Sequence, residues 1–197
     1  MSKAYEINGS SMNTDEAYSW LLEKVVSRKK EVQIFEDFLS QETSWRTSPA
    51  STRFHLCYEG GLIDHSINVA VTLLTIRSVL YPSIEEESCV LVGLYHDIGK
   101  VGQAGKPLYL PNPSEWHVKN KGINYIINND IVYMDIATRS LFMVSKFIPL
   151  TETEAQAIRY HDGQYIDENR SVAHRETPLT RLLSYADNWS GGVIEGG

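Results

Sequence analysis

The sequence predicts an all-α fold, a compact single-domain bundle of helices. Three observations favour it. Apolar residues recur every three or four positions in several segments, which is the spacing of an amphipathic helix. Residues that cap helix starts precede these segments, and Pro or Gly follows them. Strand-like patterns are few, and the clearest are residues 108–110 and 131–133.

The first helical segment begins after residue 13. Asn13 is followed three residues later by Glu16, which is a capping-box pattern. Apolar residues then recur as far as Leu39, and their spacing predicts one broken helix or two short ones. Residues 43–61 are rich in Ser, Thr, Pro and Gly, so we expect a structured loop there.

A long helix is predicted from residue 62 as far as Pro82, which ends it. Its apolar positions recur at spacings of three and four and form one inward face. His65 lies on that face, so its imidazole is expected to point into the core. The inward positions are Leu62, His65, Val69, Leu73, Ile76 and Leu80.

The following helix ends at the pair His96-Asp97. Ser83 and Glu86 form a second capping-box pattern, which is expected to start it. Gly99 supplies the break at its end. Residues 101–117 are rich in Gly and Pro and predict a long loop, a feature that is often functional inside a compact domain.

Three more helices complete the predicted bundle. Residues 136–147 have helical spacing, and a capped segment after them leads to His161. Pro178 at a first turn opens the last helix, which carries Asp187. The glycine pairs near the end of the sequence indicate a flexible segment over residues 191–197.

Composition and length indicate one globular domain. The chain has 197 residues, of which 42% are apolar, and this suffices for one core but not for a second full domain. We expect a polar tail over residues 1–12 and the domain over residues 13–190. No run of 18 apolar residues and no apolar leader are present, so neither a membrane span nor export is expected. The two cysteines make no disulfide framework, which favours a reducing, cytoplasmic location, and they form no Cys-x-x-Cys pair of the kind that binds zinc.

The formal net charge of −7 restricts the partners of the chain. Tight binding to duplex DNA needs a basic surface, so we expect no duplex DNA partner. A small anionic substrate remains compatible with the charge, because a bound cation and a few basic side chains can reverse the potential locally.

Two imidazoles and two carboxylates on predicted helices are candidate metal ligands. Mixed nitrogen and oxygen donors suit Mn, Fe, Co, Ni or Zn, and suit Mg less well. A buried carboxylate without a partner is costly, so one divalent metal is a common explanation for all four. Four protein ligands also leave positions for water and substrate. The candidate ligands are His65, His96, Asp97 and Asp187.

These residues, in this order, resemble the signature of the HD-domain metal-dependent phosphohydrolases. The segment from Pro49 to His55, continued by Gly60-Gly61-Leu62, resembles the subset that includes bacterial 3′-to-5′ exoribonucleases and small phage or bacterial nucleotide hydrolases. The resemblance covers about residues 45 to 190. It implies an HD-type helical bundle. An ordered set of four residues in matching flanks is far more specific than an isolated His-Asp pair.

The resemblance also implies further roles. His161 matches a histidine of the two-metal members, and Asp135 stands where those members usually have another histidine. A second metal at His161 and Asp135 is therefore an open alternative to a substrate contact by His161. Asp97 is the candidate for orienting the attacking water. Lys100, three residues later, is expected to contact and neutralise phosphoryl oxygens, and Arg53 to bind phosphate in a bidentate manner.

The expected activity is hydrolysis of a small nucleotide by a metal-activated water, with a deoxynucleoside mono- or triphosphate as substrate. One alternative is a 3′-5′ exonuclease or phosphodiesterase on short nucleic acid. Enzymes of that type usually carry a separate nucleic-acid-binding domain, for which this chain has no room. Another is an HD domain that binds a nucleotide without turnover. Small members of this kind are commonly oligomeric, so a homo-oligomer is an expectation by analogy.

Overall fold

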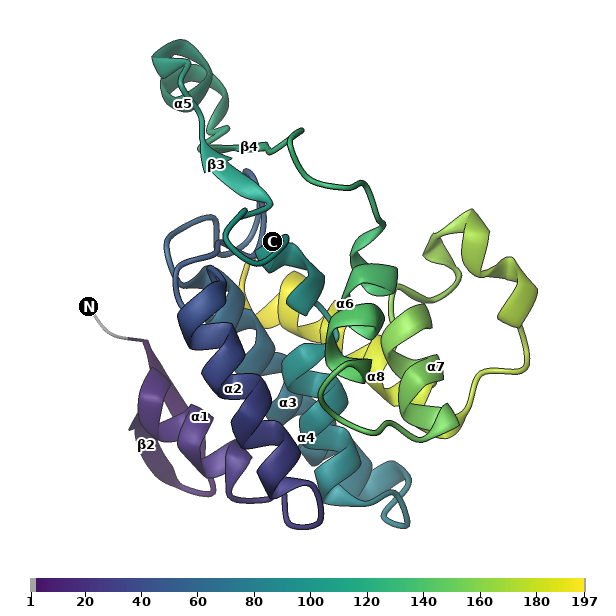
Figure 1. Cartoon of the computed structure of the whole chain (residues 1–197). Coiled ribbons are helices and arrows are strands. Elements are labelled where there is room, and N and C mark those ends of the chain that lie inside the picture. The colour runs from purple at the N-terminus through teal and green to yellow at the C-terminus, as the bar shows by residue number, and fades with distance from the viewer. Residues whose placement is uncertain (1–2, 197) are drawn as a thin grey trace.

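The computed structural model describes residues 3–196 as a body of helices with two short hairpins (Figure 1). The all-α prediction therefore needs correction only for these hairpins, and the fold is mostly α. The helices are α1 (Thr14–Leu22), α2 (Lys29–Glu42), α3 (Gly61–Leu80), α4 (Glu86–Tyr95), α5 (Glu115–Lys121), α6 (Ile136–Ser145), α7 (Glu152–Tyr160) and α8 (Pro178–Trp189). Short 3-10 turns are η1 (Ile98–Val101), η2 (Gly163–Tyr165) and η3 (Asp167–Val172), and η4 (Ser190–Ile194) is a π-helical turn.

The central helix is α3, which packs against α1, α4 and α8. It is 20 residues long, and its apolar character gives it the length and composition of a membrane-crossing helix. Its first ten residues are all buried by neighbouring helices, however, as in the core helix of a folded domain. The predicted inward face holds as far as Leu73, whereas Leu80 is 62% exposed.

α3 and α4 approach each other most closely at Gly93. A Cβ atom at that position would lie 2.7 Å from the Cα atom of Ala70 and 2.9 Å from its Cβ atom. Real Cβ atoms essentially never come that close, so the crossing requires glycine on α4. The tight crossing brings the end of α4, which leads to His96, beside the first half of α3.

Several predicted helix boundaries agree with the structure. Asn13 and Glu16 form a complete capping box at the start of α1, and Thr151 and Glu154 form one at the start of α7. Pro178 occupies the first turn of α8. The side chains of Asn13 and Thr151 satisfy backbone N–H groups that have no partner inside the helix, and proline at a first turn lacks such an N–H group.

The second predicted capping box, at Ser83 and Glu86, is wrong. α4 begins at Glu86 itself, with Glu85 as its N-cap. Residue Ile84 is held outside the helix, because its N–H donates to the carbonyl of Tyr81 and its carbonyl accepts from Arg77 Nε at 2.6 Å. A local sequence pattern gives no sign of this contact, because Arg77 belongs to the end of the preceding helix.

The polar tail predicted over residues 1–12 is wrong for the residues described there. Strands β1 (Ala4–Ile7) and β2 (Ser10–Asn13) pair antiparallel, from Ala4 opposite Asn13 to Ile7 opposite Ser10. The turn between them is Asn8-Gly9, with positive φ at both residues, which is a strong hairpin signal. Tyr5 and Ile7 alternate with exposed residues and join the core.

The flexible end predicted over residues 191–197 is also wrong where the structure describes it. α8 continues into η4, and the backbone N–H of Glu195 donates to the carbonyl of Ser190 at 2.9 Å. The side chain of Glu195 is completely buried. The Glu195 side chain therefore anchors this end of the chain to the body, while residues 192–194 and 196 are exposed. Residue 197 lies outside the described residues.

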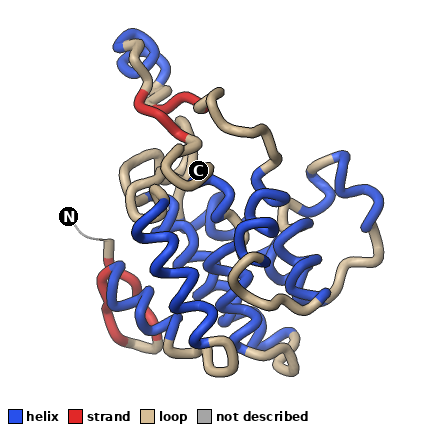
Figure 2. Tube along the Cα trace, viewed as in Figure 1, coloured by secondary structure: helices blue, strands red, loops and turns tan. Residues whose placement is uncertain are grey.

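The predicted long loop over residues 101–117 leads into a small arm. Strand β3 (Tyr109–Pro111) pairs with β4 (Tyr125–Ile127), and α5 lies between them. In Figures 1 and 2 this arm extends beyond the helical body. The strand predicted at residues 108–110 overlaps β3, whereas residues 131–133 form no strand.

A buried ion-pair network joins the loop before α2 to two later helices. Arg28 Nε donates to Glu87 of α4 at 2.7 Å, and both terminal nitrogens of Arg28 bind Glu154 of α7, at 2.7 and 2.8 Å. Ser88 also donates to Glu154 at 2.6 Å. These contacts connect the N-terminal helices with the second half of the bundle.

Candidate metal centre

Five buried or half-buried side chains from four helices converge at one point. α3 supplies His65, the end of α4 supplies His96 and Asp97, and α8 supplies Asp187. His161, which follows α7, joins them. Two overlapping sets of donor atoms lie within 4.8 Å of one another: His65, His96 and Asp97, and His96, His161 and Asp187.

The donor separations match those around one shared ion. His65 Nε2 lies 3.1 Å from Asp187 Oδ1 and 3.6 Å from Asp97 Oδ2. His96 Nε2 lies 3.6 Å from Asp97 Oδ2, and His161 Nε2 lies 3.5 Å from Asp97 Oδ1. Ligands about 2.0–2.2 Å from a metal are themselves about 3–3.5 Å apart, so these donors can hold one metal ion.

His96 and His161 are oriented by the same kind of local hydrogen bond. Each follows the end of a helix, and the Nδ1 atom of each lies 2.9 Å from the carbonyl oxygen three residues earlier, of Gly93 and Ile158 respectively. A carbonyl only accepts, so Nδ1 carries the proton and Nε2 presents its lone pair. Within the described residues, His96 Nε2 is buried without a hydrogen-bond partner. A metal ion satisfies such an atom.

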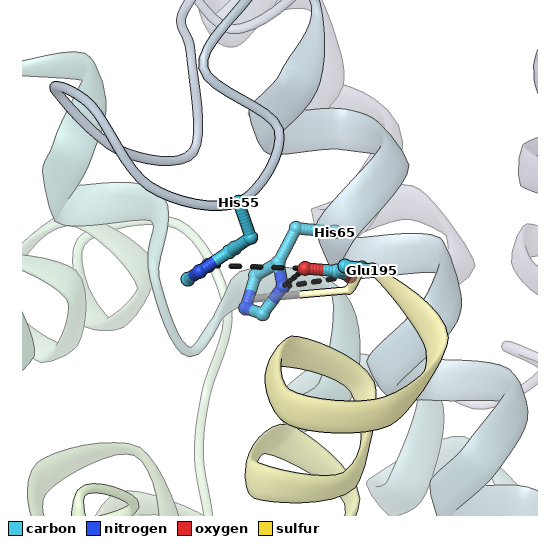
Figure 3. A group of neighbouring side chains, drawn as sticks. All are labelled: His55, His65 and Glu195. Atoms are coloured by element: carbon cyan, nitrogen blue, oxygen red, sulfur yellow. Dashed lines mark hydrogen bonds and ion pairs between the residues drawn. The ribbon is translucent and has the colours of Figure 1, made fainter. Parts of the chain in front are cut away.

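His65 is oriented by a carboxylate at the far end of the sequence. Its Nδ1 atom lies 3.1 Å from both carboxylate oxygens of Glu195, and Asn68 Nδ2 donates to the same carboxylate at 2.7 Å. Figure 3 shows Glu195 reaching this imidazole and that of His55, whose Nε2 lies 3.8 Å away. A carboxylate on Nδ1 of a histidine fixes the ring and makes Nε2 a stronger metal ligand.

The electrostatics of the cluster favour bound positive charge. Burial acts to lower the pKa of His65, but the carboxylates of Asp187 and Glu195 outweigh it and raise this pKa to about 9. Burial and the carboxylate of Asp97 have the same opposing effects on His161, whose pKa is also raised to about 9. The carboxylates thus attract either protons or a metal cation to this point.

Lys100 lies on the turn η1 that follows the His-Asp pair. Its ammonium forms an ion pair with Asp97 Oδ2. Burial acts to lower the pKa of Lys100, but the charge of Asp97 outweighs it, so this pKa is raised and the side chain stays protonated. Lys100 therefore places a positive charge directly beside the donor cluster.

Two predicted site residues are not among these donors. Arg53 is exposed, with its guanidinium 4.7 Å from the ring centroid of Phe54, and it does not line the cavity described below. Asp135 is the N-cap of α6, where it accepts from Thr138 N at 2.8 Å. Asp135 lines the cavity but belongs to neither donor set, so the structure brings His161, and not Asp135, to the metal ligands.

The cluster opens into a cavity of about 860 Å³. Its floor includes Asp97, Lys100, His161 and Asp187. Its apolar walls come from the arm and from the segments before α6 and after η2: Leu108, Ile127, Ile131, Met134 and Ile166. The site thus combines metal-ligating donors, cationic side chains and apolar surface in one space.

Sequence reasoning missed Glu195 and His55 as residues of this site, and it favoured Arg53 over Arg139 as the arginine of the cleft. Glu195 stands among glycines in a segment that gave no structural signal, and its position depends on the continuation of α8 into η4. His55 lies in a predicted loop, so no periodicity indicated the direction of its side chain. Arg139 is spaced along α6 so that it falls on the buried face of that helix. This spacing is the sequence signal that could have placed its side chain.

Comparison with known proteins identifies the family of this chain. A model of the HD domain matches residues 62–191, which is more than half of the chain. The matched region contains the five donors His65, His96, Asp97, His161 and Asp187. Neither the curated proteins nor the solved structures that were compared yielded a match. The chain belongs to the HD domain family, whose members are in general metal-dependent phosphohydrolases.

Proposed function

We propose that the chain is a metal-dependent phosphohydrolase of small nucleotides, with deoxynucleoside mono- or triphosphates as the expected substrates. The observation that carries this proposal is the convergence of three Nε2 atoms and two carboxylates on the floor of a cavity with apolar walls. A donor cluster alone indicates metal binding. The adjoining cavity adds room for an organic phosphate.

His65, His96, Asp97 and Asp187 would hold a divalent transition metal. When bound, such a metal supplies a water of lowered pKa and polarises a phosphoryl oxygen. The two oxygens of Asp97 face different groups, since Oδ2 contacts Lys100 and Oδ1 faces His161. This carboxylate is therefore placed to accept a hydrogen bond from a water and to orient it. Lys100 neutralises negative charge on the phosphoryl oxygens.

The walls of the cavity suit the nucleoside part of the substrate. The apolar side chains exclude water from one side of the cavity, which strengthens electrostatic contacts on its floor. Tyr133 also lines the cavity and is 90% exposed, so its ring is free to stack on a base. The acidic net charge and the size of the cavity favour a nucleotide over a long nucleic acid.

A substrate panel tests the proposal. Purified protein supplied with Mn²⁺, Co²⁺ or Mg²⁺ is expected to release phosphate or triphosphate from deoxynucleotides, and to leave a short oligonucleotide largely intact. Preferred cleavage of the oligonucleotide would favour the exonuclease alternative. Retention of metal and nucleotide without any product would favour the non-catalytic alternative.

Substitution of one ligand tests the role of the cluster. Asp97→Ala removes a carboxylate that faces three histidines and Lys100. We expect loss of both metal content, measured by elemental analysis, and hydrolysis. Asp37→Ala, at an exposed position of α2, is the matched control and should retain both. Full hydrolysis by metal-free Asp97→Ala protein would refute the proposed role.

A further inference from the structure

A buried arginine on the cavity wall carries a charge that no carboxylate neutralises. Arg139 of α6 is 4% exposed. Across residues 3–196 its guanidinium makes one hydrogen bond, from Nη2 to the carbonyl oxygen of Val132, and no ion pair with a carboxylate. Burial lowers the pKa of Arg139, and no nearby carboxylate offsets that effect.

Arg28 shows how the same protein treats another largely covered guanidinium. That side chain is 13% exposed and binds two carboxylates, of Glu87 and Glu154, each at 2.7 Å. A buried charge is costly unless a partner compensates it. Arg139 therefore differs from a structural arginine, because its compensating anion is absent from the described part of the chain.

The fold holds Arg139 beside the metal-ligating turn. The N–H of Gly99, two residues after Asp97, donates to Ser140 Oγ at 2.8 Å. A Cβ at Gly99 would lie 3.0 Å from the Cβ of Arg139 and 2.4 Å from the carbonyl oxygen of Ile136. The glycine thus permits α6 to pack directly on η1. Arg139 lines the same cavity as Asp97.

Most N–H donors of Arg139 have no partner among the described residues. A guanidinium has five N–H donors, and Val132 accepts from one of them. None of its nitrogens is among the sealed polar atoms that lack a partner, so the others keep some exposure to solvent, and Arg139 is one of the residues that line the cavity. The two other Lys or Arg side chains lining the cavity face carboxylates: Lys100 pairs with Asp97, and Arg159 lies 4.0 Å from Asp135.

We propose that Arg139 forms an anion-binding subsite that holds a phosphate group of the substrate, a role that rests on the proposed hydrolysis of nucleotides. A phosphate supplies the missing negative charge, and its oxygens match the planar fork of a guanidinium. The subsite lies on the α6 wall, whereas the metal donors come from α3, the α4–η1 turn, the end of α7, and α8. Arg139 takes the place in the cavity that the sequence suggested for Arg53.

Binding of inorganic phosphate and pyrophosphate to the metal-loaded full chain tests this subsite. Hydrogen bonds to charged groups are strong enough that Arg139→Gln is expected to weaken binding by about 10- to 100-fold in isothermal calorimetry. Arg139→Lys keeps the positive charge but not the planar, forked donors of the guanidinium, so a smaller loss of phosphate affinity is expected. Arg181→Gln, at an exposed position of α8, is the control and should bind as the original chain does.

Metal content and melting temperature, measured without phosphate, separate this role from a structural one. We expect both to be retained in Arg139→Gln, because the substitution removes an unpaired charge. Phosphate should raise the melting temperature of the original chain and of Arg139→Lys more than that of Arg139→Gln. Equal phosphate affinity in Arg139→Gln would overturn the subsite, and so would loss of metal and folding in both Arg139 variants.

The same measurements distinguish failure of the subsite from failure of the proposed function. Phosphate binding that depends on Arg139, in a chain that hydrolyses no nucleotide, would refute the hydrolysis and leave an anion site. Nucleotide hydrolysis with an unchanged KM in Arg139→Gln would refute the subsite and leave the hydrolysis.

Discussion

The two ring nitrogens of His65 face different partners. Nε2 faces the carboxylates of Asp97 and Asp187, and Nδ1 faces Glu195. The ring therefore lies between the metal donors and a buried carboxylate that fixes its orientation. Glu195 is in turn held by Asn68, one helical turn after His65 on α3.

Substitution of Glu195 is expected to weaken metal binding without removing a ligand. Loss of such an outer partner typically costs about 10- to 100-fold in metal affinity, and we expect a decrease of this order for Glu195→Gln. Competition with a chromogenic chelator, using Co²⁺ or Zn²⁺, measures it. Glu115→Gln, at an exposed position of α5, is the control. Unchanged affinity in Glu195→Gln would show that Glu195 does not tune His65.

The residues that the structure brings together at the donor cluster include those whose chemistry has a local signature in the sequence. His96 and Asp97 are adjacent, and His65 lies on an apolar face next to a Gly-Gly-Leu flank. Glu195 and Arg139 have no such signature. Their roles depend on how α8 ends and on how closely α6 packs, which are properties of the folded chain.

At the scale of elements, the crossing of α3 and α4 sets the position of the metal-ligating turn. The two helices touch through Gly93 and Ala70, so any larger side chain on α4 must push the helices apart. α4 carries His96 at its end, and the crossing therefore couples helix packing to the donor cluster.

Gly93→Val is expected to destabilise the fold. Overpacking of a closely packed core costs about 1–3 kcal/mol and occasionally more, and we expect a decrease of about 2–3 kcal/mol in the free energy of unfolding, measured with urea. Gly192→Ala is the control, because a Cβ there meets no atom within 4 Å. A Gly93→Val protein as stable as the original chain would contradict the tight crossing.

Helix boundaries were predictable where a cap acts within its own helix. Asn13 and Thr151 have this property, and both capping boxes are present. The start of α4 was mispredicted because Arg77, on another helix, holds the carbonyl of Ile84. The N-terminal hairpin was missed although Asn8-Gly9 is a strong turn signal, since the short strands beside it resemble a polar tail in composition.

At the scale of the whole molecule, the Arg28 network connects the two halves of the bundle. Burial acts to raise the pKa of Glu87, but hydrogen bonds from Arg28 and Ser27 outweigh it and lower this pKa to about 2. The pKa of Glu154 is lowered as well, because hydrogen bonds from Arg28 and Ser88 outweigh its burial. Both carboxylates therefore stabilise the folded state in their charged forms.

Acidification is expected to weaken this connection. The pKa of Glu87 is lower in the folded state than its ordinary value of 4.5, so its contribution is fully present above about pH 4.5 and is lost as the pH falls toward 2. The free energy of unfolding, measured by urea titration at a series of pH values, should decrease over this range. A flat profile there would contradict the assignment.

Arg28→Ala tests the same network at neutral pH. It leaves two buried carboxylates without their cation, and breaking a buried pair in this way costs about 3–5 kcal/mol. The variant should also lose less stability on acidification, because its carboxylates no longer have strongly lowered pKa values. Arg170→Ala, in an exposed pair with Asp167, is the control and should change stability by less than about 1 kcal/mol.

The donors of the metal centre are distributed along the chain from residue 65 to residue 187, on four different helices. In an unfolded chain only the adjacent His96 and Asp97 are close in sequence, so the other donors join them only through folding, unlike a site whose ligands are all close neighbours in sequence. The full set of ligands is therefore complete only after the helices have assembled. The apoprotein is consequently expected to fold before it is loaded, and the ion to reach its ligands through the cavity that they line.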